Sequence, residues 1–125
     1  MAAGYFKQFV LTKDVRRISV CGKISLNSSG NVTAVDVPMV TSVTKTGAGL
    51  YTINLSTHFT KTRALMFHYQ SAQNSVQVYV SADNSANTTT PNVQIRVTES
   101  GVTGDVSTAG DIHCIMEFKD SGVKS

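Results

Sequence analysis

Three histidines and two cysteines are the side chains of this 125-residue chain best suited to bind a metal or to act as nucleophiles: His58, His68, His113, Cys21 and Cys114. A zinc site needs three or four ligands that converge, and the sequence contains neither His-x-His nor Cys-x-x-Cys. We therefore expect the histidines to be surface residues or hydrogen-bonded interior residues. The sequence predicts neither a metal nor a cofactor.

The carboxylates also lack the pattern of a catalytic site. General acid–base catalysis needs paired carboxylates, and nucleophilic catalysis needs a nucleophile beside its base. The eight acidic residues are isolated, mostly at expected turns and strand ends: Asp14, Asp36, Asp83, Glu99, Asp105, Asp111, Glu117 and Asp120. We therefore predict that the protein is not an enzyme.

Two glycines around Ala48 raise the question of a phosphate-binding loop. Such a loop needs a helix directly after its glycines, because the helix N-terminus supplies the amides and the dipole. After Gly49 the sequence alternates instead, with Tyr51, Ile53 and Leu55 separated by polar residues. This period of two predicts a strand, so Gly47 and Gly49 are expected to form a hairpin turn.

The same alternation recurs along the chain, and no window has the apolar spacing of a helix. The expected strands are separated by clusters of Gly, Asn and Ser at residues 27–31, 47–49, 71–74, 82–92 and 99–111. This pattern predicts an all-β fold, either an antiparallel β-sandwich or a jelly-roll-like barrel of about eight strands. The sandwich should span residues 14–120, with residues 121–125 as a flexible tail.

Three of the expected strands carry more detailed predictions. In residues 17–26, Gly22 interrupts an apolar face, which suggests a bulge or a bend where the strand changes partners. Residues 64–70 are bulky on both faces, which suggests a central strand covered on two sides. In the last strand Cys114 should point inward, whereas Cys21 points with Ser19 away from the apolar face, so both thiols are expected to be free.

Composition excludes several classes of function. The net charge is only +3, and Arg16 and Arg17 are the one adjacent basic pair, so no specific binding of nucleic acid is expected. No apolar run approaches the ~18 residues of a membrane span, and residues 1–11 lack the features of a signal peptide. We therefore expect a protein made in the cytoplasm that does not bind membranes.

Aromatic residues crowd the N-terminal segment, residues 1–13, which is either the first core strand or an arm that docks on a partner. Tyr5, Phe6 and Phe9 would supply apolar contact area to such an interface. Arg16 and Arg17 follow, and arginine is favoured for bidentate contacts with acidic groups. These five residues are the predicted partner-binding set.

Four segments together resemble a known group of proteins. They are "VTKTGAGLYTINL", the aromatic-rich "ALMFHYQ", the loop "TGDVSTAGD" and the last strand "IHCIMEF". Over residues 40–120 the chain resembles the small all-β virion proteins of tailed bacteriophages, such as head-decoration, head-fibre and fibre-associated proteins. The resemblance implies a jelly roll or sandwich, a homotrimer, a place in the virion, and binding to the major capsid protein or other virion proteins. On this basis the expected function is to decorate or cement a capsid.

A second function follows from the aromatic and amide side chains. Receptor- or carbohydrate-binding modules of phage fibres combine aromatic platforms with amides and acids. Tyr51, Tyr69 and Tyr79, with Asn74 and Asn84, could supply such a site. This alternative places the chain in a fibre or tail rather than on the head.

Overall fold

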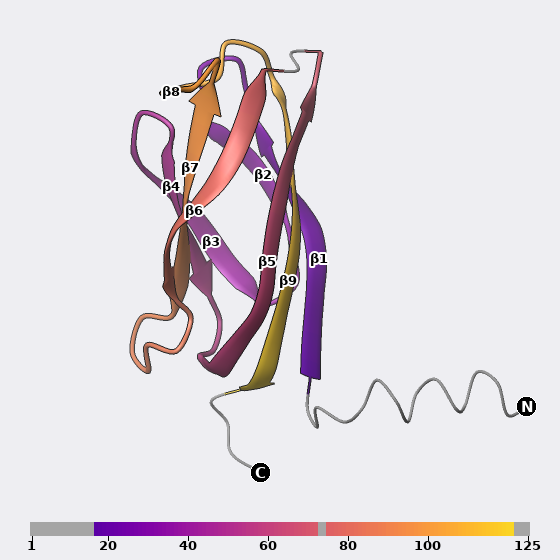
Figure 1. Ribbon diagram of the computed structural model, residues 1–125, viewed down its shortest axis with the longest axis vertical. Coiled ribbons are helices and arrows are strands. Elements are labelled where there is room, and N and C mark those ends of the chain that lie inside the picture. The colour runs from indigo at the N-terminus through magenta and orange to yellow at the C-terminus, as the bar shows by residue number, and fades with distance from the viewer. Residues whose placement is uncertain (1–16, 73–74, 122–125) are drawn as a thin grey trace, which may run out of the picture.

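The computed structural model describes residues 17–72 and 75–121, with side chains up to residue 119, and shows only strands and turns there (Figure 1). The strands of this part are β1 (Arg17–Leu26), β2 (Val32–Asp36), β3 (Val40–Gly47), β4 (Leu50–Leu55), β5 (Phe59–Ser71), β6 (Val76–Asn84), β7 (Asn92–Glu99), β8 (Val102–Thr103) and β9 (Gly110–Ser121). The described residues contain no helix that could span a membrane.

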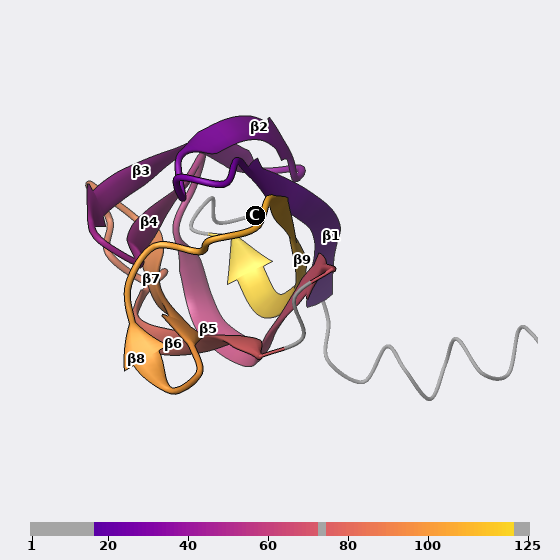
Figure 2. The same ribbon diagram turned by 90° about the horizontal axis from the view of Figure 1, so that it is seen from above.

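The strands form two antiparallel sheets that face each other across the core (Figure 2). Sheet A has the order β2-β1-β9-β5, and sheet B has the order β3-β4-β7-β6, with the short β8 pairing with β7. The predicted all-β sandwich is therefore confirmed. Its sheets are open at the edges and do not close into a barrel, and the described strands number nine rather than eight.

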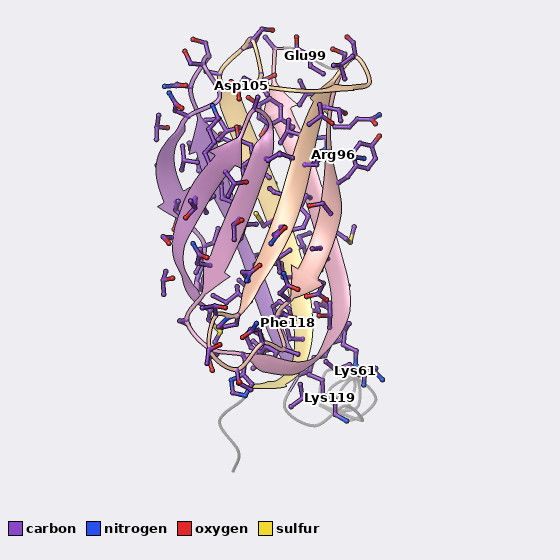
Figure 3. All side chains as sticks on the ribbon, turned by 90° about the vertical axis from the view of Figure 1, so that its left-hand side faces the viewer. Lys61, Arg96, Glu99, Asp105, Phe118 and Lys119 are labelled. Carbon is purple, nitrogen blue, oxygen red and sulfur yellow. The ribbon has the colours of Figure 1, made fainter. Side chains whose placement is uncertain are left out.

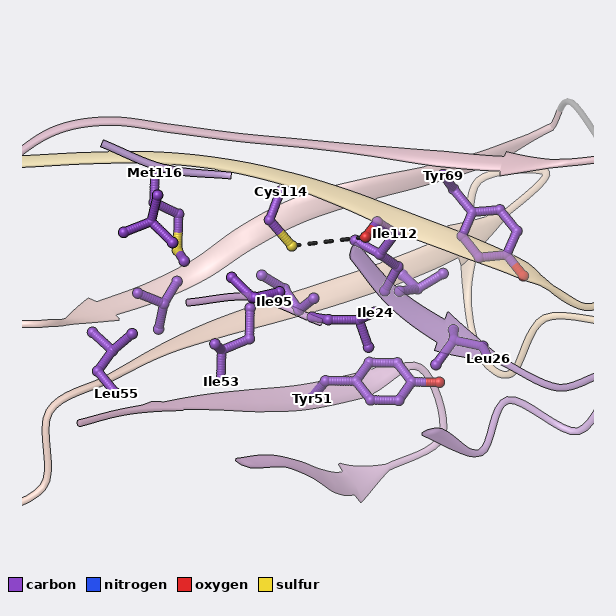
Figure 4. Close-up of a cluster of buried hydrophobic side chains, with 14 of the residues drawn as sticks. Ile24, Leu26, Tyr51, Ile53, Leu55, Tyr69, Ile95, Ile112, Cys114 and Met116 are labelled. Carbon is purple, nitrogen blue, oxygen red and sulfur yellow. Dashed lines mark hydrogen bonds between the residues drawn. The ribbon is translucent and has the colours of Figure 1, made fainter. Parts of the chain in front are cut away.

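The core is made by the alternate residues that each sheet turns inward (Figure 4). On β9, Ile112, Cys114 and Met116 are at most 1% exposed, as the alternation predicts. Ile53 on β4 and Ile95 on β7 meet them from sheet B. At the lower end of the molecule in Figure 3, the ring of Phe118 stacks on Phe59 with centroids 4.1 Å apart.

The glycine motif is a hairpin turn, as expected. β3 and β4 pair from Gly47 opposite Leu50, so Ala48 and Gly49 form the turn between them. Gly49 has a φ of 73°, and a Cβ there would also lie 2.6 Å from the carbonyl oxygen of Gly104. Glycine is therefore needed both for the backbone angle and for the close approach of a neighbouring loop.

No bulge forms at Gly22, although β2 begins to pair with β1 at the next residue, Lys23. β1 pairs with β9 in continuous register through Gly22, and the irregularity against β2 lies between Ser25 and Leu26. A Cβ at Gly22 would lie 2.2 Å from the carbonyl oxygen of Asp36 and 2.7 Å from the Cα of Val37. The residue is small because the chain leaving β2 passes directly over it.

The expectation that residues 64–70 form a central strand covered on two sides is also wrong. β5 extends from Phe59 to Ser71 and is the edge strand of sheet A, paired only with β9 among the described strands. Tyr69 is buried, whereas Met66 is 59% exposed. Bulky residues on both faces of β5 therefore mean that one face carries apolar side chains into solvent.

Candidate binding surfaces

The acidic residues of the loops hold the loops together. Asp105, at the upper end of Figure 3, accepts a hydrogen bond from the Gly49 amide at 3.2 Å and forms an ion pair with Lys45 at 2.9 Å. The contact with Lys45 keeps the pKa of Asp105 below its ordinary value. Glu99 accepts hydrogen bonds from the amide of Ser107 at 3.0 Å and from its hydroxyl at 2.8 Å. These carboxylates act as structural acceptors.

The outer face of sheet A carries an exposed row of apolar and thiol side chains. Ile115 on β9 lies opposite Cys21 on β1 and opposite Met66 on β5. Ile115 is 42% exposed, Met66 is 59% exposed, and Cys21 is also exposed. We call these three residues the outer row. Exposed apolar side chains that adjoin one another commonly mark a contact surface.

Two histidines lie side by side next to the outer row. His68 on β5 and His113 on β9 occupy directly opposite positions, and with Met66 and Ile115 they line a shallow hollow of about 110 Å³. The Nε2 atom of His113 lies 2.7 Å from the Oε1 atom of Gln70. In the described part of the chain, no three His, Cys, Asp or Glu residues gather as a metal site.

A second surface lies where the edge strands β5 and β6 adjoin. A groove of about 230 Å³ is lined there by Phe67, His68, Tyr69, Val76, Gln77, Val78 and Tyr79. Tyr79 is 44% exposed, and the guanidinium of Arg96 (labelled in Figure 3) lies 5.5 Å from its ring centroid. The Tyr79 hydroxyl donates a hydrogen bond to Gln77. The groove thus combines an aromatic ring, an amide and an imidazole.

The structure separates the residues predicted for a ligand site. Tyr69 and Tyr79 both line the groove, although Tyr69 is only 5% exposed and its hydroxyl donates to the Thr108 carbonyl at 2.8 Å. Asn84, at the far end of β6, donates a hydrogen bond from its Nδ2 atom to the Oδ1 atom of Asn92 at 3.1 Å. Asn74 lies outside the described residues.

Tyr51 is a core residue and presents no platform to solvent. It is 1% exposed, and its hydroxyl donates to the Gly30 carbonyl. Burial, with Asp105 and Tyr69 nearby, raises the pKa of Tyr51 to about 12. The ring faces sheet A across the sandwich (Figure 4).

Of the predicted partner-binding residues, only Arg17 is described. It begins β1 and its guanidinium forms an ion pair with Glu117 on the neighbouring β9. Tyr5, Phe6, Phe9 and Arg16 lie outside the described residues.

Sequence reasoning missed the outer row and the histidine pair. The alternation places Met66 and His68 on one face of their strand, but it does not show that this face remains uncovered. The meeting of His68 with His113 depends on the register of β5 against β9. Only the adjacency of two strands far apart in the sequence brings these side chains together.

Comparisons of the chain with protein-family models, with curated proteins and with solved structures find no match.

Proposed function

We propose that this chain is a structural protein of a bacteriophage particle, which decorates or cements the capsid by binding shell proteins without catalysis. The confirmed all-β sandwich agrees with the resemblance of residues 40–120 to small virion proteins. The protein acts as a homo-oligomer, a trimer, whose copies meet through the outer row of sheet A. The N-terminal segment, residues 1–13, attaches it to the shell.

The observation that carries this proposal is the exposure of Met66 and Ile115 in the middle of a sheet face. Burial of apolar area stabilises an interface by about 25 cal/mol per Å², so these side chains favour a partner over water. On sheet B, Tyr79 of β6 is 44% exposed and lies opposite Arg96, on the face away from the buried Ile95. A contact between the outer row of one copy and the Tyr79 side of the next would be head-to-tail, and such a contact closes into a ring when the copies are related by rotation.

The experiment has two parts. The purified chain should sediment with capsid shells assembled without it, and light scattering after gel filtration should give the mass of a trimer. Met66→Glu should shift the mass to that of a monomer, whereas Thr44→Glu, on the exposed edge strand β3, should leave the trimer intact. A monomeric wild-type chain would contradict the oligomer, and a failure to sediment would contradict the virion role.

A carbohydrate- or receptor-binding module of a fibre or tail is the second candidate, favoured by the groove between β5 and β6. An exposed aromatic ring beside amide and imidazole groups suits a sugar, because the ring contacts C–H groups while the polar groups bind hydroxyls. Under this proposal Tyr79→Ala abolishes glycan binding measured by saturation-transfer NMR, and Met66→Glu does not. Equal binding by the wild type and Tyr79→Ala would exclude the groove.

A further inference from the structure

His68 and His113 not only share the outer face of sheet A but also occupy directly opposite positions on β5 and β9. Residues directly opposite in an antiparallel pair have Cβ atoms about 4.5–5.5 Å apart. Two imidazoles at this spacing can turn toward a common point above the sheet. Both residues line the hollow of about 110 Å³, together with Met66, Phe67 and Ile115.

The hydrogen bond to Gln70 prepares one of the two rings. The Oε1 atom of an amide accepts hydrogen bonds, so the Nε2 atom of a neutral His113 donates to it at 2.7 Å. This bond leaves the lone pair on the Nδ1 atom of His113. Histidines that bind metals commonly donate their other ring N–H to a carbonyl or a carboxylate, which fixes the tautomer and the orientation of the ring.

Charged side chains of both signs lie near His68 and His113. One would repel a bound cation and two would attract it. Lys23 on β1 lies opposite His113 and places a positive charge on the same row. Asp36 on β2 lies opposite Lys23 on its other side, and Asp111 lies two positions before His113 on β9. The two carboxylates thus reduce the repulsion that Lys23 would exert on a bound cation.

We propose that His68 and His113 bind one transition-metal ion of the zinc or copper type on the outer face of sheet A. Neutral imidazole is a preferred ligand of these ions. The protein supplies two nitrogen ligands, and the thioether of Met66, which lines the same hollow, is a third donor for a soft ion. The remaining positions are open to water or to donor groups of a neighbouring molecule, as in metal sites that hold an exchangeable ligand.

The test is a calorimetric titration of the full-length chain with Zn²⁺ and, separately, with Cu²⁺. We expect one ion per chain, and an affinity at least about 10-fold lower in either His68→Ala or His113→Ala. The matched control is His58→Ala, which removes the remaining histidine, located between β4 and β5. This variant should bind as the wild type does. Gln70→Leu should weaken binding about 10-fold while leaving both ligands in place, the lower end of what the loss of a ligand's hydrogen-bond partner costs.

The site is excluded if neither ion binds, or if His68→Ala and His113→Ala bind as tightly as the wild type. It is also excluded if His58→Ala loses as much affinity as they do. Because His68 is exposed and His113 is half-buried at the surface, circular dichroism of the variants should match the wild type. The titration needs no capsid, so its result does not depend on attachment to a shell. Met66 and Ile115 line both this hollow and the proposed contact between copies, so the mass of the chain is measured in the same buffer.

Discussion

At the scale of single residues, burial separates side chains of the same type. Cys21 lies exposed on the outer face of β1, and Cys114 lies 1% exposed in the core, where its thiol approaches the Ile112 carbonyl at 3.8 Å. Burial raises the pKa of the Cys114 thiol to about 12. Because the thiolate is the reactive form, Cys114 should be inert while the protein is folded.

The corresponding prediction concerns alkylation. Iodoacetamide added to the native protein at pH 8 should modify Cys21 alone, and the same reagent added after denaturation should modify both cysteines. Mass spectrometry distinguishes one adduct from two. Labelling of Cys114 at the rate of Cys21 would contradict its burial, and a species lighter by two hydrogens would reveal a disulfide.

The contact between Lys45 and Asp105 predicts a dependence of stability on pH. Its hydrogen bond lowers the pKa of Asp105 in the folded protein. A lowered folded pKa stabilises the fold at pH values above the unfolded pKa, about 3.9, and this contribution is lost as the pH falls through the folded pKa. Both groups are partly exposed, so the contribution should be below about 1 kcal/mol.

Urea unfolding of the wild type and of Asp105→Asn tests this dependence. The wild type should be the more stable at pH 7, and the difference should shrink toward zero between pH 4 and pH 2. Lys45→Met should reproduce the effect, and the double variant should add little to either single change. A difference that stays constant with pH would show that the charge on Asp105 does not contribute.

At the scale of elements, a small residue in β1 is required by a neighbouring segment rather than by its own strand. Gly22→Ala would place a Cβ 2.2 Å from the Asp36 carbonyl oxygen, and backbone atoms cannot give way as a side chain can. We expect the free energy of unfolding to fall by about 3 kcal/mol, the upper end of what overpacking costs. The measurement is chemical denaturation followed by circular dichroism.

Gly104→Ala is the matched control for this prediction. A Cβ at Gly104 meets nothing within 4 Å, and its φ requires no glycine. Its stability should therefore change by less than about 0.5 kcal/mol. Equal losses in the two variants would contradict the close approach at Gly22 as the cause, because the lower entropy of the unfolded chain favours alanine at both positions.

The alternation of apolar and polar residues largely predicted the strands. It did not predict which strands lie next to each other in the sheets. The period of two in β4, β7 and β9 identified both the strands and their buried faces, because those faces meet the core. The edge position of β5 depends on sheet order, which the local pattern does not contain. Tyr51 and Tyr69 were predicted for a ligand site although the alternation placed each on the apolar face of its strand, and both are buried.

At the scale of the whole molecule, the described core is built from residues between Val20 and Phe118. Its apolar side chains come from both sheets and pack against one another. If residues 1–11 are a docking arm, as one of the two sequence predictions has it, their deletion should leave a folded sandwich. Circular dichroism and a cooperative thermal transition would establish that the truncated chain is folded.

Under the proposed virion role, the truncated chain should no longer sediment with capsid shells. The deleted segment contains Tyr5, Phe6 and Phe9, whose burial at about 25 cal/mol per Å² would contribute several kcal/mol to an interface. The outer row of sheet A remains in the truncated chain. The truncated chain should therefore form an oligomer with the same number of copies as the full-length protein. An unfolded product would instead make residues 1–11 part of the core, and a folded product that still sediments would place the attachment surface on the sandwich.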